Sequence, residues 1–211
     1  MAKLNYDRNT AARHLIRKDQ QLGRFISGVK ETPPLPKREV DLFLSLSRSI
    51  VYQQLSGKAA ATIFSRFAGL FPNQQPSAGL SCNYSVEKLR SVGLSRNKAL
   101  AVLDLADKIE TKQLPGRRRL LRMSDMEIID TLTIVRGIGP WTAQMFLIFN
   151  LGRADVMPAG DLAIRKGFQQ LMQLEEMPDE AGLLLLTEHW KPYRSAAAWY
   201  LWRVVDGDND W

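Results

Sequence analysis

The fold of this chain is decided by ten residues, IVRGIGPWTA at positions 134–143. Gly137 and Gly139 allow a tight turn, because glycine adopts positive φ at little cost, and their missing side chains leave the backbone open to a ligand. Pro140 follows, and proline is well tolerated at the first position of a helix. The free N–H groups of that helix start would point toward the glycines. The stretch predicts a hairpin between two helices that can hold a phosphate, although Gly-x-Gly alone fits an ordinary helix corner.

Helical patterns continue on both sides of this hairpin, and no run of alternating residues predicts a strand. A capping box at residues 124–127 begins the helix that leads into it. Residues 31–36, with three prolines, predict a linker, and residues 71–82, rich in Pro, Gly and Ser, predict a loop. We therefore expect an all-α protein, with further helices over residues 7–18, 20–29, 40–52, 58–69, 86–91, 96–111, 140–150, 161–171, 178–189 and 195–205.

Length and composition limit the class of protein. The 211 residues are 45% hydrophobic, enough for one domain with a core or for two small lobes that share an interface. The single cysteine, Cys82, excludes an internal disulfide and any zinc or iron–sulfur site that needs several thiolates. No apolar run approaches the roughly 20 residues of a membrane span, and residues 1–7 have no apolar signal core. We expect a soluble intracellular protein without a membrane partner.

The charge balance favours an acidic partner. Lys and Arg total 29 against 22 Asp and Glu, a net charge of +7, with a pI near 9.7. A basic surface attracts polyanions, of which nucleic acid is the common intracellular one, although many basic proteins bind no DNA specifically.

Four further stretches accompany the hairpin in a characteristic order: residues 50–60 (IVYQQLSGKAA), 92–99 (VGLS with Lys98 and Ala99), 155–167 (DVMPAGDLAIRKG) and 190–195 (WKPYRS). Together the five stretches resemble the helix-hairpin-helix (HhH-GPD) superfamily of DNA glycosylases, in particular the 3-methyladenine DNA glycosylase II branch. The resemblance spans about Thr10 to Val205. It leaves no room for the N-terminal β domain of some members, so we expect the compact form.

The resemblance implies a fold and a reaction. The fold is a single glycosylase unit over residues 1–211, with two helical lobes, 36–140 and 1–35 plus 141–211, and an active-site cleft between them. The reaction is one step of base excision repair, in which an alkylated purine such as 3-methyladenine is flipped out of the duplex and its N-glycosidic bond is hydrolysed.

Asp161 is the candidate catalytic residue. Taken alone, an Asp after a Gly/Pro-rich loop is a common N-cap of the following helix, and that role would suffice. The resemblance adds a carboxylate that faces the sugar and stabilises the positive charge that develops there, or activates the attacking water. Both roles are compatible.

The resemblance also implies a base pocket with Trp141, Trp202 and Met145. Trp141 stands where lyase-type members carry a lysine nucleophile, so we expect a monofunctional enzyme that leaves an abasic site. An aromatic face attracts a cationic alkylated base, by about 0.5–2 kcal/mol. The alternative for Trp141 and Trp202 is ordinary core packing, which Trp199 and Tyr200 on the same apolar helix favour for Trp202.

Two segments are expected to contact DNA. The hairpin would do so through Gly137, Gly139 and Thr142. The break between two helices, which comprises Gln53, Gln54, Leu55 and Ser56, corresponds to a loop that enters the minor groove in relatives, and Gln54 is our candidate for the plug that fills the vacated space. Without the resemblance, Gln53 and Gln54 are a plain helix end.

The expected partner is double-stranded DNA that contains alkylated bases, bound by a monomer. No cofactor is required and no iron–sulfur cluster is expected. The hairpin of this family often holds a monovalent cation, Na⁺ or K⁺, here through the backbone carbonyls of Thr133, Val135 and Ile138. His14 and His189 are interpreted as structural or surface residues, not as metal ligands. The protein would act in the cytoplasm at the nucleoid of a bacterium or archaeon, or in a eukaryotic nucleus.

Two alternatives remain at this point. A bifunctional or adenine-mismatch glycosylase would carry a lysine at position 141 or a cluster of four cysteines, and the sequence has neither. A non-catalytic helix-hairpin-helix module would explain the charge and the hairpin, but neither Asp161 in its motif nor Trp141 after the turn. The range of lesions is open, since 3-methyladenine, 7-methylguanine and ethenoadenine all fit.

Overall fold

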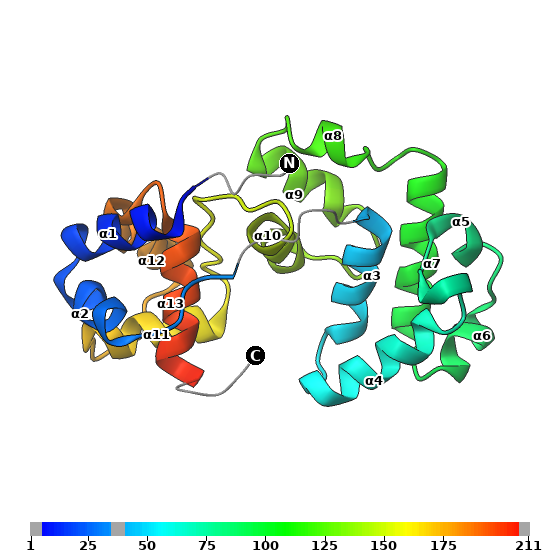
Figure 1. The fold of residues 1–211 in the computed structure, drawn as a ribbon, viewed down its shortest axis with the longest axis horizontal. Coiled ribbons are helices and arrows are strands. Elements are labelled where there is room, and N and C mark those ends of the chain that lie inside the picture. The colour runs from blue at the N-terminus through cyan, green and yellow to red at the C-terminus, as the bar shows by residue number, and fades with distance from the viewer. Residues whose placement is uncertain (1–5, 35–40, 207–211) are drawn as a thin grey trace. The chain divides into compact units, whose positions relative to one another are not determined.

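The computed structural model describes residues 6–34 and 41–206, and within these ranges it contains helices and no strand. The all-α expectation is confirmed. The elements, drawn in Figure 1, are α1 (Arg8–Lys18), α2 (Gln20–Gly28), α3 (Leu42–Tyr52), α4 (Gly57–Ala68), η1 (Pro72–Gln74), α5 (Ala78–Ser81), α6 (Val86–Ser91), α7 (Arg96–Glu110), α8 (Arg117–Leu120), α9 (Asp125–Thr133), α10 (Pro140–Phe149), α11 (Leu162–Met172), α12 (Glu180–Leu186), η2 (Glu188–Trp190) and α13 (Arg194–Asp206).

The chain divides into two compact units. The central unit comprises residues 39–146, and the terminal unit comprises residues 1–38 and 147–211. The sequence analysis expects lobes of residues 36–140 and of residues 1–35 plus 141–211, and this division assigns Trp141 and Met145 to the terminal lobe. With the boundary at 146, the first two turns of α10 belong to the central unit, together with Trp141 and Met145. The expected linker is non-helical over residues 31–34, and its last two residues lie outside the described ranges.

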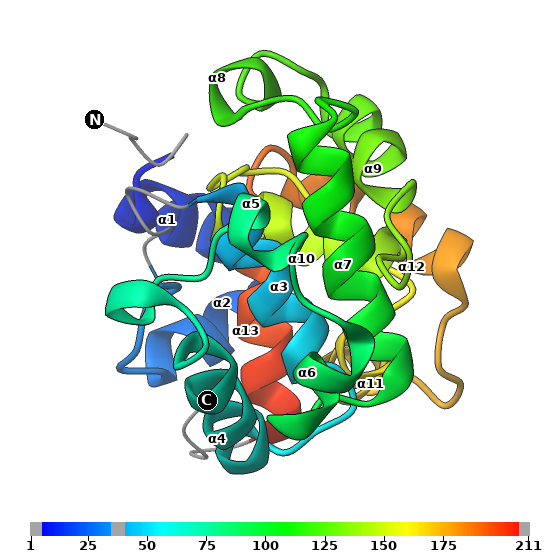
Figure 2. The same ribbon diagram turned by 90° about the vertical axis from the view of Figure 1, so that its right-hand side faces the viewer.

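The central unit is organised around α7, which packs against α3, α5 and α6, while α3 also packs against α4. Figure 2 shows α3 and α7 side by side. Apolar side chains at helical spacing fill the space between these two helices. Those that are fully buried include Leu46 and Ile50 from α3 and Val102 and Leu105 from α7.

The terminal unit is built on the crossing of α11 with α13, beside the pair α1 and α2. Gly167 is the contact point of this crossing. A Cβ at Gly167 would lie 2.3 Å from the carbonyl oxygen of Leu201, so only glycine lets the two helices approach this closely.

Both histidines make structural contacts in this unit, as expected. Nε2 of His189 lies 3.1 Å from Oδ2 of Asp19, which also accepts a hydrogen bond of 2.9 Å from the indole of the fully buried Trp190. The His14 ring meets the ring of Tyr193 edge-on, with centroids 5.1 Å apart. The described residues contain no group of three or more His, Cys, Asp or Glu side chains that could hold a metal ion.

The sequence prediction was wrong for two segments. Residues 71–82, predicted as a loop, contain η1 and the one-turn helix α5. Ala78 and Ser81 of α5 are buried, and α5 packs against α7, so tertiary packing stabilises a helix too short to show a periodicity. Residues 178–189, predicted as one helix, are divided into α12 and η2. No helix in the described part of the chain has the length and apolar character needed to cross a bilayer.

Candidate nucleic-acid interface and catalytic carboxylate

The two glycines of the hairpin between α9 and α10 differ in backbone conformation and in the space around them. Gly137 has φ of +76°, and a Cβ there would lie 3.3 Å from Cβ of Ala101. Gly139 is outside the positive-φ region, and a Cβ there would meet nothing within 4 Å. The expectation of positive φ therefore holds for Gly137 alone. Gly139 leaves open space in front of the first turn of α10, where an anion could approach the free N–H groups.

A carboxylate on α7 holds the start of this hairpin. Oδ2 of Asp104 accepts a hydrogen bond of 2.8 Å from the backbone N–H of Arg136, and Oδ1 lies 2.7 Å from Nζ of Lys108. Partial burial raises the pKa of Asp104, but the hydrogen bonds from Lys108 and the Arg136 amide outweigh it and lower the pKa below its usual value. Asp104 is thus ionised at neutral pH.

The break between α3 and α4 is attached to the hairpin through Gln53. Nε2 of Gln53 donates to the carbonyl of Gly137 at 2.9 Å and lies 3.4 Å from Oγ1 of Thr142. Gln54 has a left-handed backbone, with φ of 55°, and is exposed. Leu55 is 39% exposed. The loop therefore turns Gln53 inward as a brace and Gln54 and Leu55 outward, where either could enter a groove.

These segments surround a cavity of about 490 Å³ in the central unit. Seven of the predicted site residues line it, and Ser49 and Tyr52 of α3 line it as well, although the sequence did not indicate them. Trp141 is 47% exposed, so it is not a core residue. The predicted residues that line the cavity are Gln53, Gln54, Gly137, Gly139, Trp141, Thr142 and Met145.

In the terminal unit, Asp161 is the N-cap of α11, as the sequence predicts. Its Oδ1 accepts hydrogen bonds from the backbone N–H groups of Ala163 at 2.8 Å and Ile164 at 3.1 Å. Its Oδ2 accepts one from the indole N–H of Trp202 at 3.3 Å. Both oxygens are thus oriented, and the carboxylate lies at the positive end of the α11 dipole.

Trp202 is held beside this carboxylate. The indole stacks on Phe149 with ring centroids 5.8 Å apart and an interplanar angle of 26°, and it is only 7% exposed. The structure thus brings Asp161 and Trp202 together. Core packing accounts for the ring of Trp202, and the hydrogen bond to Asp161 accounts for its nitrogen.

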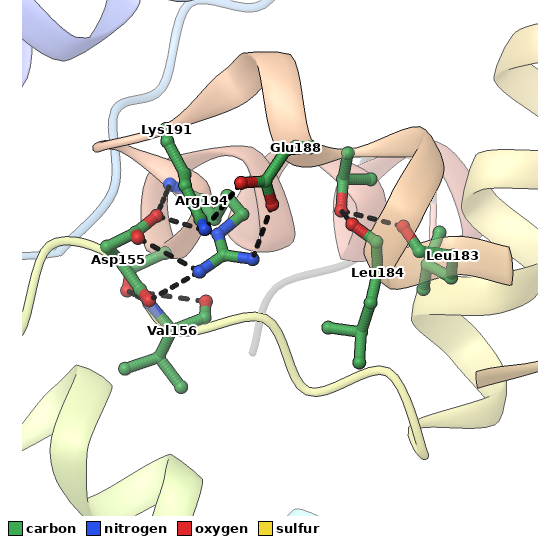
Figure 3. A network of polar contacts seen from close by, with 9 residues as sticks. Asp155, Val156, Leu183, Leu184, Glu188, Lys191 and Arg194 are labelled. Atoms are coloured by element: carbon green, nitrogen blue, oxygen red, sulfur yellow. Dashed lines mark hydrogen bonds and ion pairs between the residues drawn. The ribbon is translucent and has the colours of Figure 1, made fainter. Parts of the chain in front are cut away.

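The loop that leads to Asp161 is tied to the start of α13 (Figure 3). Asp155 accepts two hydrogen bonds from the Arg194 guanidinium, at 2.7 Å from Nε and 2.9 Å from an Nη. The backbone N–H of Val156 donates to Oγ of Ser195 at 2.9 Å, and the N–H of Ser195 donates to the carbonyl of Ala154 at 3.0 Å. A bidentate Arg–carboxylate pair is a strong and directional contact, so it fixes the path of the loop that presents Asp161.

Besides Ser49 and Tyr52, the sequence did not indicate the contacts of Asp104, Asp155, Arg194 and Lys98. The last of these donates from Nζ to the carbonyl of Gln53 at 2.6 Å. Lys98, Asp155 and Arg194 lie inside the stretches that carry the family resemblance, which is the signal that could have singled them out. Asp104 has only a lysine four residues later, and that spacing is typical of any exposed helix.

The carbonyl groups expected to hold a monovalent cation lie at the last residue of α9 (Thr133) and in the turn between α9 and α10 (Val135 and Ile138). The carbonyl of Val135 accepts a hydrogen bond of 3.0 Å from the N–H of Ile138. Carbonyl oxygens are among the ligands that hard cations prefer.

The chain is similar to known proteins over most of its length. The HhH-GPD family model, described as HhH-GPD superfamily base excision DNA repair protein, matches residues 47–192. DNA-3-methyladenine glycosylase 1 of Schizosaccharomyces pombe is 37% identical over 186 residues, which cover 88% of this chain and 81% of that protein.

Two solved structures are similar to this protein over more than 90% of its chain. One is a 3-methyladenine DNA glycosylase of Schizosaccharomyces pombe in complex with abasic DNA, with a TM-score of 0.79 and 35% identity over 92% of this chain and 95% of the other. The second is a DNA-3-methyladenine glycosidase from Bacillus halodurans, with a TM-score of 0.81 and 33% identity over 93% and 89% of the two chains. These matches confirm the resemblance drawn from the five sequence stretches. The chain belongs to the HhH-GPD superfamily of base excision DNA repair proteins.

Proposed function

We propose that this protein is a monofunctional DNA glycosylase that flips an alkylated purine such as 3-methyladenine out of duplex DNA and hydrolyses its N-glycosidic bond. The observation that carries the proposal is the Asp161 carboxylate, held by two helix amides on one oxygen and by Trp202 on the other. The relatives named as DNA-3-methyladenine glycosylases support the same assignment.

The Asp161 carboxylate acts on the sugar. When the C1′–N bond breaks, its electron pair leaves with the base and positive charge develops on the sugar ring. A fixed anion beside that ring stabilises the transition state more than the ground state, as carboxylates do in glycoside hydrolysis. Water then adds to C1′ and loses its proton, which leaves an abasic site.

Trp141 acts on the base. Its half-exposed indole offers an aromatic face to a cationic alkylated purine, and that contact is worth about 0.5–2 kcal/mol. Because an indole cannot form a Schiff base with the sugar, the reaction stops at the abasic site and the strand is not cut. Met145, one turn later on α10, lines the same cavity.

The DNA backbone is held by the hairpin and by the loop at residues 53–56. The N–H groups at the start of α10 bind one phosphate across the space left by Gly139. Gln54 fills the space that the flipped base vacates, which offsets an unstacking cost of a few kcal/mol. The protein acts as a monomer on duplex DNA, at the nucleoid or in the nucleus.

A monovalent cation at the hairpin is part of the proposal. Na⁺ or K⁺ would be held by the carbonyls of Thr133, Val135 and Ile138 and would add positive charge near the bound phosphate. Duplex affinity should then be higher in K⁺ or Na⁺ than in tetramethylammonium at equal ionic strength. Equal affinity in all three salts would remove the cation from the proposal.

The deciding experiment measures free base released from a methylated duplex by the wild type and by Asp161→Asn. The wild type should release 3-methyladenine, and the variant should release almost none while it binds the same duplex with unchanged affinity. The alternative, a DNA-binding module without activity, predicts no release by either protein. Strand cleavage by the wild type without added alkali would contradict the monofunctional assignment.

A further inference from the structure

One face of α7 contacts both segments that the proposed function directs at DNA. Lys98, Ala101 and Asp104 are spaced by three residues, so they lie along one side of the helix and span about 9 Å of its axis. Lys98 contacts the end of α3, Ala101 lies against Gly137, and Asp104 holds the N–H of Arg136.

Lys98 makes the contact that bears on the loop. Its Nζ donates to the carbonyl of Val51 at 2.8 Å and to the carbonyl of Gln53 at 2.6 Å. These carbonyls lie at the C-terminal end of α3, where the helix leaves its last acceptors unsatisfied and its dipole favours a cation. Burial lowers the pKa of Lys98, and its two hydrogen bonds to carbonyls favour the charged form.

The carbonyl of Gln53 belongs to the same planar peptide group as the nitrogen of Gln54. When Lys98 holds that oxygen, it sets the plane from which the chain enters the left-handed conformation of Gln54. Such a conformation costs a non-glycine residue about 1 kcal/mol or more, so it persists only where its surroundings impose it. The side-chain amide of Gln53 donates a hydrogen bond to the carbonyl of Gly137 in the hairpin. The loop is therefore held at two points, by Lys98 and by the hairpin.

We propose that Lys98 is a positioning residue for base flipping: it fixes the Gln53–Gln54 peptide so that Gln54 projects toward the duplex. The inference rests on the proposed function, because it assigns Lys98 to the flipping step and not to bond cleavage. Loss of its ammonium group should slow excision where the base must be unstacked and should matter little where it is already unstacked.

The test compares Lys98→Met with Lys88→Met, a matched control at an exposed position on α6. Single-turnover excision is measured on one lesion in a fully paired duplex and in a mismatched site, where unstacking costs less. We expect Lys98→Met to lose about 10-fold or more on the paired duplex and less than about 3-fold at the mismatch, a difference of about 0.7 kcal/mol or more in the flipping step. The control should match the wild type on both substrates.

A double-mutant cycle with Gln54→Ala tests whether Lys98 acts on excision through Gln54. If Lys98 acts through Gln54, the double variant should be no slower than the slower single variant, whereas independent effects would multiply. Lys98→Arg, which keeps the donors, should recover most of the lost activity. If Lys98→Met does not fold, as judged by thermal unfolding, Lys98→Gln replaces it in the same measurements.

The possible failures are distinguishable. An equal loss on both substrates, or multiplied effects in the cycle, would overturn the role of Lys98 and leave the proposed function intact. A wild type that releases no base from any substrate would overturn the proposed function and this inference with it.

Discussion

At the scale of single residues, Asp161 combines a structural and a chemical role that two substitutions separate. Asp161→Asn keeps an N-cap, since Asn caps as well as Asp, whereas Asp161→Ala removes it at a cost of about 1 kcal/mol. We expect both variants to lose base release and only the Ala variant to unfold earlier in urea. A destabilised Asn variant would indicate that the negative charge, and not the cap, supports α11.

Trp141 is a second residue whose substitution should affect DNA binding and base release to different extents. Because its ring is half exposed at the cavity, Trp141→Ala should leave folding and most of the duplex affinity intact. Base release should fall by about 2- to 30-fold, which corresponds to the loss of one aromatic contact of about 0.5–2 kcal/mol to a cationic base. The measurement is single-turnover release beside a duplex-binding titration. Equal losses in the two assays would place Trp141 in general DNA binding.

At the scale of elements, the hairpin depends on the open space at Gly139. An alanine there has an allowed backbone and no close neighbour, so we expect Gly139→Ala to change the free energy of unfolding by less than about 0.5 kcal/mol. Duplex binding should weaken nonetheless, because the added methyl group obstructs the approach of a phosphate to the N–H groups of α10. Unchanged affinity would place the phosphate elsewhere.

At the crossing of α11 and α13, by contrast, we expect a glycine-to-alanine substitution to reduce stability. A Cβ at Gly167 would lie 2.3 Å from a backbone carbonyl, and a helix backbone cannot yield as a flexible side chain can. Gly167→Ala should therefore destabilise the protein by about 2–3 kcal/mol, as overpacking does. Thermal unfolding of this variant beside Gly139→Ala provides a matched pair of glycine substitutions. A stability close to that of the wild type would show that the two helices can separate freely.

At the scale of the whole molecule, a net charge of +7 predicts that DNA binding depends on salt. The logarithm of the binding constant should fall linearly with the logarithm of the salt concentration, by about 0.9 for each phosphate neutralised. We expect a slope of about −2 or steeper, since the hairpin and the loop each contact at least one phosphate. The slope is measured by fluorescence anisotropy with an undamaged duplex at salt concentrations from about 50 to about 300 mM. A flat response would contradict the electrostatic contribution.

The helical class, most helix boundaries and the caps could be predicted from the sequence, because these depend on interactions within a few residues. The capping box at Ser124 is formed, and Asp161 caps α11. The tertiary structure alone decided which distant groups meet: Lys98 with the carbonyl of Gln53, the Gln53 amide with the hairpin, and Trp202 with Asp161. It also decided that α5 is helical. The reason is physical: a local pattern specifies local hydrogen bonds, whereas contacts between residues tens of positions apart exist only once the helices have packed.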